Sequence, residues 1–164
     1  MISLNWGSDL KRKLLELGAC VLLCEMVGFF SASVSMASMT DFYSSINKPA
    51  FAPPSWLFAP VWLALYALMG AAFYLLWRSR KADKVWAFTA FGVQLFLNFL
   101  WSPIFFGNRM FGAAFAELVL LWFAIAATMV FSWRISKGAV VLLIPYIVWV
   151  TIAGALNFNV WVLN

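Results

Sequence analysis

The sequence predicts an all-α membrane protein, a bundle of five transmembrane helices, and two observations carry this prediction. Of its 164 residues, 65% are hydrophobic and only 10% are charged, whereas soluble domains carry about 25% charged residues. The charged residues also cluster in short segments that separate five long apolar runs. A chain of this composition cannot hide its apolar surface from water, which excludes a soluble globular domain, a disordered chain and a nucleic-acid-binding protein.

Each apolar run is close to or longer than the roughly 20 residues that cross a bilayer as a helix. The runs predict one domain over residues 1–164, with helices at about 14–38, 55–77, 85–106, 111–133 and 138–160. The second, third and fifth runs contain no charged residue, whereas the first contains Glu16 and Glu25 and the fourth contains Glu117. The runs are continuously apolar and about twice as long as a barrel strand, which excludes a transmembrane β-barrel.

The basic residues predict the orientation of the bundle, because cytoplasmic segments of membrane proteins are enriched in Lys and Arg. Nine of the eleven lie before the first predicted helix, between the second and third, or between the fourth and fifth. With five spans these three segments share one side of the membrane, and only Lys48 and Arg109 lie on the other. We therefore expect the N-terminus in the cytoplasm and the C-terminus outside.

The connection between the first two predicted helices is long. Residues 40–55 read TDFYSSINKPAFAPPS and contain three prolines, which restrict the backbone, together with three aromatic residues. Loops of this length inside a compact domain are typically functional lids or disordered segments. The prolines and aromatic side chains favour a rigid lid over the outer end of the bundle.

Polar and aromatic residues recur at helical spacing on three of the predicted helices. Residues three or four positions apart lie on one face of a helix. The resulting faces are Gln94, Asn98 and Trp101; Trp62, Tyr66 and Met69; and Tyr146, Trp149, Ala153 and Asn157. The predicted topology puts Trp149 nearer the midplane. It brings five of these residues to the outer half of the bilayer, beneath the long loop: Trp62, Tyr66, Asn98, Trp101 and Asn157.

Two interpretations of these faces remain open, because polar groups in hydrocarbon must be paired or line a cavity. One is a pocket for a flat, mainly apolar ligand, with aromatic walls and a few orienting polar groups. The other is interhelical packing, in which Gln94 and Asn98 form hydrogen bonds worth about 0.6 kcal/mol each. For the set as a whole we favour the pocket.

Residues suited to metal binding or acid–base catalysis are scarce. The chain has no histidine, which removes the commonest metal ligand and general base. Cys20 and Cys24 lie in an apolar run, where packing is the simpler interpretation. Glu25, deep in the first predicted helix, is either a functional carboxylate or a group at a helix interface. We predict no catalytic residue, no metal site and no required cofactor.

Three blocks of the sequence are distinctive. They are NKPAFAPPSWLFAPVWLALYALMG at 47–70, QLFLNFLWSPIFF at 94–106 and PYIVWVTIAGALNFNVWVLN at 145–164. In motif and spacing they resemble the translocator protein family, also called tryptophan-rich sensory protein or peripheral-type benzodiazepine receptor. The similarity covers nearly the whole chain, and the departures include Phe42 and Phe51, which stand where the family pattern has tryptophan.

The resemblance implies a five-helix bundle, usually a homodimer, with a pocket for tetrapyrroles such as protoporphyrin IX or haem. It also implies binding of isoquinoline- and benzodiazepine-type small molecules, and roles in porphyrin transport, sensing or breakdown. The pocket positions that it carries over to this chain come from the loop and three helices: Tyr43, Pro53, Trp62, Tyr66, Asn98, Trp101, Trp149 and Ala153.

Three functions are consistent with these residues. The first is a tetrapyrrole-binding membrane receptor or transporter. The second is light-dependent oxidative degradation of bound porphyrin, with Trp62 and Trp149 as redox-active walls. The third is a structural membrane protein without a specific ligand, in contact only with lipid and partner helices.

Two further expectations follow from the C-terminal residues. The family's sterol motif is broken, because Phe158 follows Leu156 and no basic residue occurs after Lys137, so cholesterol binding through it is not expected. The lack of a basic tail and of histidine favours a prokaryotic member, in the cell membrane.

Overall fold

The computed structural model describes residues 6–81 and 83–164, without the side chains of residue 6 and residues 35–44. Its elements are α1 (Trp6–Ser45), the 3-10 turn η1 (Ser55–Leu57), α2 (Phe58–Arg78), α3 (Val85–Ser102), the π-helical turn η2 (Pro103–Gly107), α4 (Phe111–Trp133) and α5 (Lys137–Leu163). The described residues contain five helices long and apolar enough to cross a membrane, which confirms the predicted fold class.

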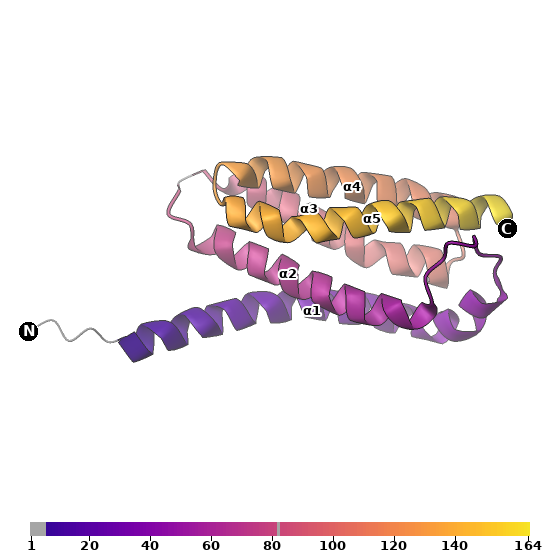
Figure 1. Cartoon of the computed structure of the whole chain (residues 1–164), viewed down its shortest axis with the longest axis horizontal. Coiled ribbons are helices and arrows are strands. Elements are labelled where there is room, and N and C mark those ends of the chain that lie inside the picture. Colours follow the sequence, from indigo (N-terminus) through magenta and orange to yellow (C-terminus); the bar gives the residue numbers. More distant parts are fainter. Residues whose placement is uncertain (1–5, 82) are drawn as a thin grey trace, which may run out of the picture.

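The helices form a closed ring rather than a layer. Helix α1 packs against α2 and α3, α2 against α5, α5 against α4, and α4 against α3 (Figure 1). Every helix therefore presents one side to the interior of the bundle and the other side to the surroundings. Large apolar side chains cover the outer side, as expected for a surface in contact with lipid.

The two ends of the bundle differ in charge. The α2–α3 and α4–α5 connections lie at the same end as the start of α1, and the C-terminus lies at the opposite end (Figure 1). The nine basic residues of these segments are thus gathered at one end, which we call the basic end. Which side of the membrane this end faces stays a prediction.

The first helix is longer than predicted, and the loop after it is correspondingly shorter. Helix α1 runs from Trp6 to Ser45 instead of 14–38, so only residues 46–54 separate it from η1. The expected lid at 40–55 was therefore wrong at its start. The hydropathy pattern marks the membrane-crossing part of a helix, whereas a helix continues until its backbone is interrupted. Here the first such signal is Pro49, which disfavours helical geometry in the residue before it.

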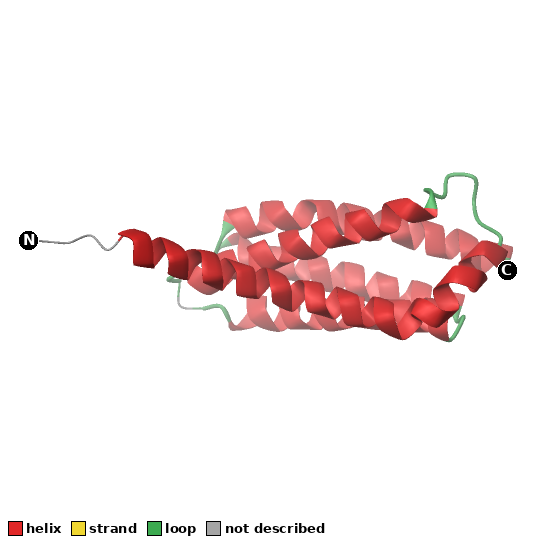
Figure 2. Ribbon diagram, turned by 90° about the horizontal axis from the view of Figure 1, so that it is seen from below, coloured by secondary structure: helices red, strands yellow, loops and turns green. Residues whose placement is uncertain are grey.

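The end of α1 bends across the end of the bundle toward the C-terminus (Figure 2). The hydrogen bonds of Asn47 agree with this path. Its backbone N–H donates to Asn164 Oδ1 (3.0 Å), and Asn164 Nδ2 donates to the Asn47 carbonyl (3.0 Å). The Asn47 side-chain amide also donates to the Leu163 carbonyl (3.3 Å). The first loop is thus tied to the end of α5.

Two close contacts set the position of α1. A Cβ atom at Gly70 of α2 would lie 2.8 Å from the carbonyl oxygen of Cys20, so only glycine permits this crossing of α1 and α2. On the other side, the Ser31 hydroxyl donates to the Phe99 carbonyl of α3 (2.8 Å). That carbonyl would normally accept the N–H of residue 103, but Pro103 has none. A side chain from α1 therefore satisfies a group that the proline leaves unpaired.

Candidate functional site

The centre of the candidate site is Asn98, whose side chain links three helices. Its Oδ1 accepts a hydrogen bond from the Tyr66 hydroxyl of α2, and its Nδ2 donates to the Tyr146 hydroxyl of α5 (2.7 Å). Tyr146 is completely buried, and Tyr66 and Asn98 are 6% and 5% exposed. The sequence predicted these three residues on converging faces, and the structure joins them directly.

A second polar link lies nearer the C-terminal end of the bundle. Trp101 Nε1 of α3 donates to Asn157 Oδ1 of α5 (3.1 Å), and Asn157 Nδ2 donates to the Phe111 carbonyl at the start of α4 (2.8 Å). Between η2 and α4 the chain forms an irregular turn, in which the N–H groups of Asn108 and Met110 donate to the first two carbonyls of η2. Asn157 therefore connects α5 with α3 and with the start of α4. Ala153 is buried on the same side of α5, between Tyr146 and Asn157 in sequence.

Aromatic side chains surround these polar links. The Trp62 ring lies 5.7 Å from the Tyr66 ring and 6.4 Å from the Tyr146 ring, measured between centroids. The Trp149 ring meets Phe58 edge to face at 5.9 Å. Because Phe58 is the first residue of α2, this contact lies close to the point where the first loop and η1 enter the bundle. The two predicted tryptophan walls are thus both half-buried and next to other rings.

Several buried polar atoms near these residues have no hydrogen-bond partner among the described residues. They are the indole N–H of Trp149, both polar atoms of the Gln94 side-chain amide and both carboxyl oxygens of Glu117. Gln94 and Glu117 are 1% and 7% exposed. A dry polar group without a partner costs about 1–3 kcal/mol. These atoms are therefore the interior polar groups that remain available to a bound water or ligand.

The remaining predicted residues come from the first loop. Pro53 is half-buried within residues 46–54. Tyr43 belongs to the end of α1 rather than to a loop, and its side chain lies outside the described residues. The loop has its own internal turn, in which the Ala52 N–H donates to the Pro49 carbonyl (3.0 Å).

Three residues of the site were not predicted from the sequence: Gly28, Phe58 and Glu117. Gly28 of α1 lies directly against the Tyr66 ring, and a Cβ atom there would overlap it. No sequence signal marks this glycine. Phe58 lies in the distinctive first block but has no polar or spacing feature that separates it from its neighbours. Glu117 was visible as the single charge of its span, without a sign of what it faces.

The described residues contain no group of three or more His, Cys, Asp or Glu side chains that could hold a metal ion. What the site offers is aromatic surface together with hydrogen-bond donors and acceptors. Such a site can bind and orient a ligand through ring contacts and polar edges.

Comparison with known proteins shows the family of this chain. The sequence model that describes the TspO/MBR family matches residues 20–162, nearly the whole described bundle. The chain belongs to the TspO/MBR family. It is accordingly a multi-pass integral membrane protein of the TspO type.

Relatives from this family include bacterial and animal proteins. The chain is 36% identical to the tryptophan-rich protein TspO of Chlorobaculum tepidum over 159 residues, which cover 94% of this chain and 99% of the relative. It is 41% identical to protein CrtK of Rhodobacter capsulatus over 137 residues, covering 81% and 84%. It is 36% identical to the translocator protein of Bos taurus over 143 residues, covering 85% of each.

Proposed function

We propose that this protein is a tetrapyrrole-binding TspO-type membrane protein that holds a porphyrin such as protoporphyrin IX or haem. The ligand would lie between the first loop and the hydrogen-bonded layer of Tyr66, Asn98 and Tyr146. Trp62 and Trp149 would contact its faces, and the half-buried Pro53 would lie on the loop side. Isoquinoline- and benzodiazepine-type molecules, which are also flat and mainly apolar, would compete for the same place.

The observation that carries this proposal is the indole of Trp149. Its N–H is buried and has no partner among the described residues, while its ring forms an edge contact with Phe58. An indole N–H in a bundle interior normally finds an acceptor. A ligand with a polar edge and a flat apolar face supplies both the missing acceptor and a surface for the ring.

The test is a titration of the purified protein in detergent with protoporphyrin IX, in which the dissociation constant is obtained from the Soret absorbance of the porphyrin. This readout does not depend on which tryptophan is removed. Trp149→Ala should weaken binding at least about fivefold, because a lost ring contact costs about 1 kcal/mol or more. Trp149→Phe keeps an aromatic ring without the N–H, and its dissociation constant should lie between those of the wild type and Trp149→Ala.

The matched control is Trp133→Phe. Trp133 is the last residue of α4, is 56% exposed, and lies at the basic end. This variant should bind like the wild type. Spectral changes that grow linearly with porphyrin and are equal in all variants would mean partitioning into detergent, and the structural interpretation without a specific ligand would replace the proposal.

A second candidate function is light-dependent oxidation of the bound porphyrin by dioxygen. The observation in its favour is the close group of oxidisable rings formed by Trp62, Tyr66 and Tyr146. Under illumination in air, the Soret band of the bound porphyrin should decay faster than in a dark or oxygen-free control. Trp62→Phe and Trp149→Phe should slow this decay at equal porphyrin occupancy, and equal decay in all three proteins would exclude both tryptophans from the reaction.

A further inference from the structure

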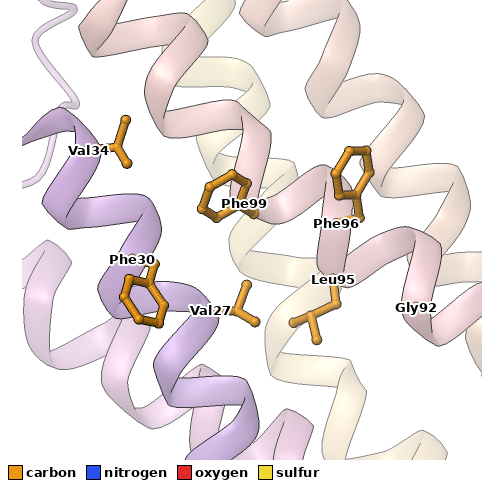
Figure 3. Close-up of a pocket in the computed structure, with 7 residues that line it drawn as sticks. All are labelled: Val27, Phe30, Val34, Gly92, Leu95, Phe96 and Phe99. Carbon is orange, nitrogen blue, oxygen red and sulfur yellow. The ribbon is translucent and has the colours of Figure 1, made fainter.

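An open apolar groove runs along the outer surface of the bundle, between α1 and α3. Val27, Phe30 and Val34 form its α1 side, and Phe96 and Phe99 form its α3 side (Figure 3). The hollow has a volume of about 560 Å³. The Phe30, Val34 and Phe96 side chains are 51%, 63% and 61% exposed, so the groove opens toward the bilayer.

The groove continues toward the basic end. A second hollow of about 300 Å³ shares Gly92 and Leu95 with the first. It extends to Leu23 of α1, Trp77 of α2 and Phe88 of α3. Trp77 is the penultimate residue of α2, and Phe88 lies in the first turn of α3. The combined groove therefore begins at the basic end, beside the end of α2 and the start of α3.

The length of the groove matches one leaflet of a bilayer. On α1 it extends from Leu23 to Val34, and on α3 from Phe88 to Phe99. Eleven helical steps correspond to about 16 Å along the helix axis. Half of a hydrocarbon core about 30 Å thick is nearly the same distance. A single acyl chain that starts at the interface would fill the groove to the middle of the membrane.

Basic residues lie in the segment of chain between Trp77 and Phe88, the two groove residues at its open end. Lys84 Nζ donates to the carbonyl of Trp77, one of the groove residues (2.9 Å). Arg78 follows Trp77 and is paired with Glu16 (2.8 Å), and the exposed Arg80 is two residues further. The nine basic residues of this end outnumber its acidic residues, so its net charge is positive. Phospholipid head groups with net negative charge are attracted to such a border.

We propose that the groove is a binding site for a phospholipid with an anionic head group. One acyl chain lies in the groove between α1 and α3, and the phosphate lies beside Lys84 and Arg80. The net positive charge at the open end of the groove is complementary to an anionic head group. A second copy of the chain is the alternative occupant that the experiment distinguishes.

Native mass spectrometry of the full chain tests this proposal, with phosphatidylglycerol and phosphatidylcholine of identical acyl chains in competition. The wild type should retain one phosphatidylglycerol in preference to phosphatidylcholine. The preference should be about fivefold for each basic residue that contacts the phosphate. Lys84→Gln with Arg80→Gln should bring the two lipids to equal binding.

Gly92→Leu fills the floor of the groove and should abolish retention of both lipids. A Cβ atom at Gly92 would meet nothing within 4 Å, so the backbone at this position accepts a side chain without a clash at Cβ. Gly154→Leu is the matched control, because a Cβ atom at Gly154 of α5 also meets nothing within 4 Å and lies away from the groove. Arg109→Gln, at the opposite end, controls for loss of charge.

Three results would overturn the proposal. The first is equal retention of the two lipids by the wild type, and the second is unchanged lipid retention in Gly92→Leu. The third is a dimer in the same spectra that Gly92→Leu converts to a monomer whatever lipid is present, which would assign the groove to a second copy. If Gly92→Leu does not fold, the double variant Lys84→Gln with Arg80→Gln still tests whether the site prefers an anionic head group. Porphyrin affinity is measured separately and should be unchanged in Gly92→Leu.

Discussion

Replacement of Asn98 by leucine is the most direct test of how the interior is held together. Leucine has the same number and branching of side-chain heavy atoms as asparagine, although its methyl groups are larger, and it neither donates nor accepts a hydrogen bond. Asn98→Leu removes the hydrogen bond from Tyr66 and the one to Tyr146. Two interhelical hydrogen bonds at about 0.6 kcal/mol each contribute about 1.2 kcal/mol in a membrane bundle.

The size of this loss depends on the two tyrosine hydroxyls, which remain buried after the substitution. Tyr66 and Tyr146 are 6% and 0% exposed, so water does not readily replace Asn98. A stranded buried hydroxyl costs about 1–3 kcal/mol. We therefore expect the free energy of unfolding to fall by between about 1 and 3 kcal/mol. The triple variant with Tyr66→Phe and Tyr146→Phe should recover part of that loss, since neither tyrosine hydroxyl is then left stranded.

The assay is equilibrium unfolding in mixed micelles with increasing denaturing detergent, followed by circular dichroism. Asn159→Leu is the control, because the only side-chain hydrogen bond of Asn159 among the described residues stays within its own helix, from its amide to the Ala155 carbonyl (2.8 Å). The reasoning is refuted if Asn98→Leu is no less stable than this control. It is also refuted if the triple variant is less stable than Asn98→Leu alone.

Three further predictions follow from the same contacts. Gly28→Ala should displace the Tyr66 ring and lower both the thermal midpoint and the porphyrin affinity, measured by thermal unfolding and the Soret titration. An unchanged midpoint and affinity would mean that the ring moves aside without cost. Gln94→Leu should raise the thermal midpoint by removing a buried amide without partners, while weakening porphyrin binding; a lower midpoint would mean that water already satisfies the amide. Asn164→Ala removes two hydrogen bonds to Asn47 and should increase hydrogen exchange in residues 46–54; unchanged exchange would show that the loop is held by other contacts.

Local chemistry made much of the fold predictable. Whether a stretch crosses a membrane depends on its own length and hydropathy, so the five spans follow from the sequence, and the fourth helix was predicted with the bounds of α4. Helical spacing also identified the inward faces, since Gln94, Asn98, Tyr146 and Asn157 are all buried. Periodicity gives the side of a helix but not the residue that it meets.

The partner of each group depended on how the helices pack. Asn98 could have met any neighbour, and the sequence left packing and pocket as alternatives; the structure pairs it with Tyr66 and Tyr146, while the Trp149 N–H is left without a partner among the described residues. The groove between α1 and α3 is likewise a property of the crossing of two helices and not of either one.

The sequence by itself therefore determined that this chain is a five-helix membrane protein with polar groups inside, because hydropathy and charge act residue by residue. Tertiary structure decided which of those groups satisfy one another. Helix α1 shows the difference: its apolar run is plain in the sequence, but its length to Ser45 and the bond from Ser31 to the Phe99 carbonyl are not. That bond exists because Pro103, on another helix, leaves a carbonyl unpaired at the point where the two helices meet.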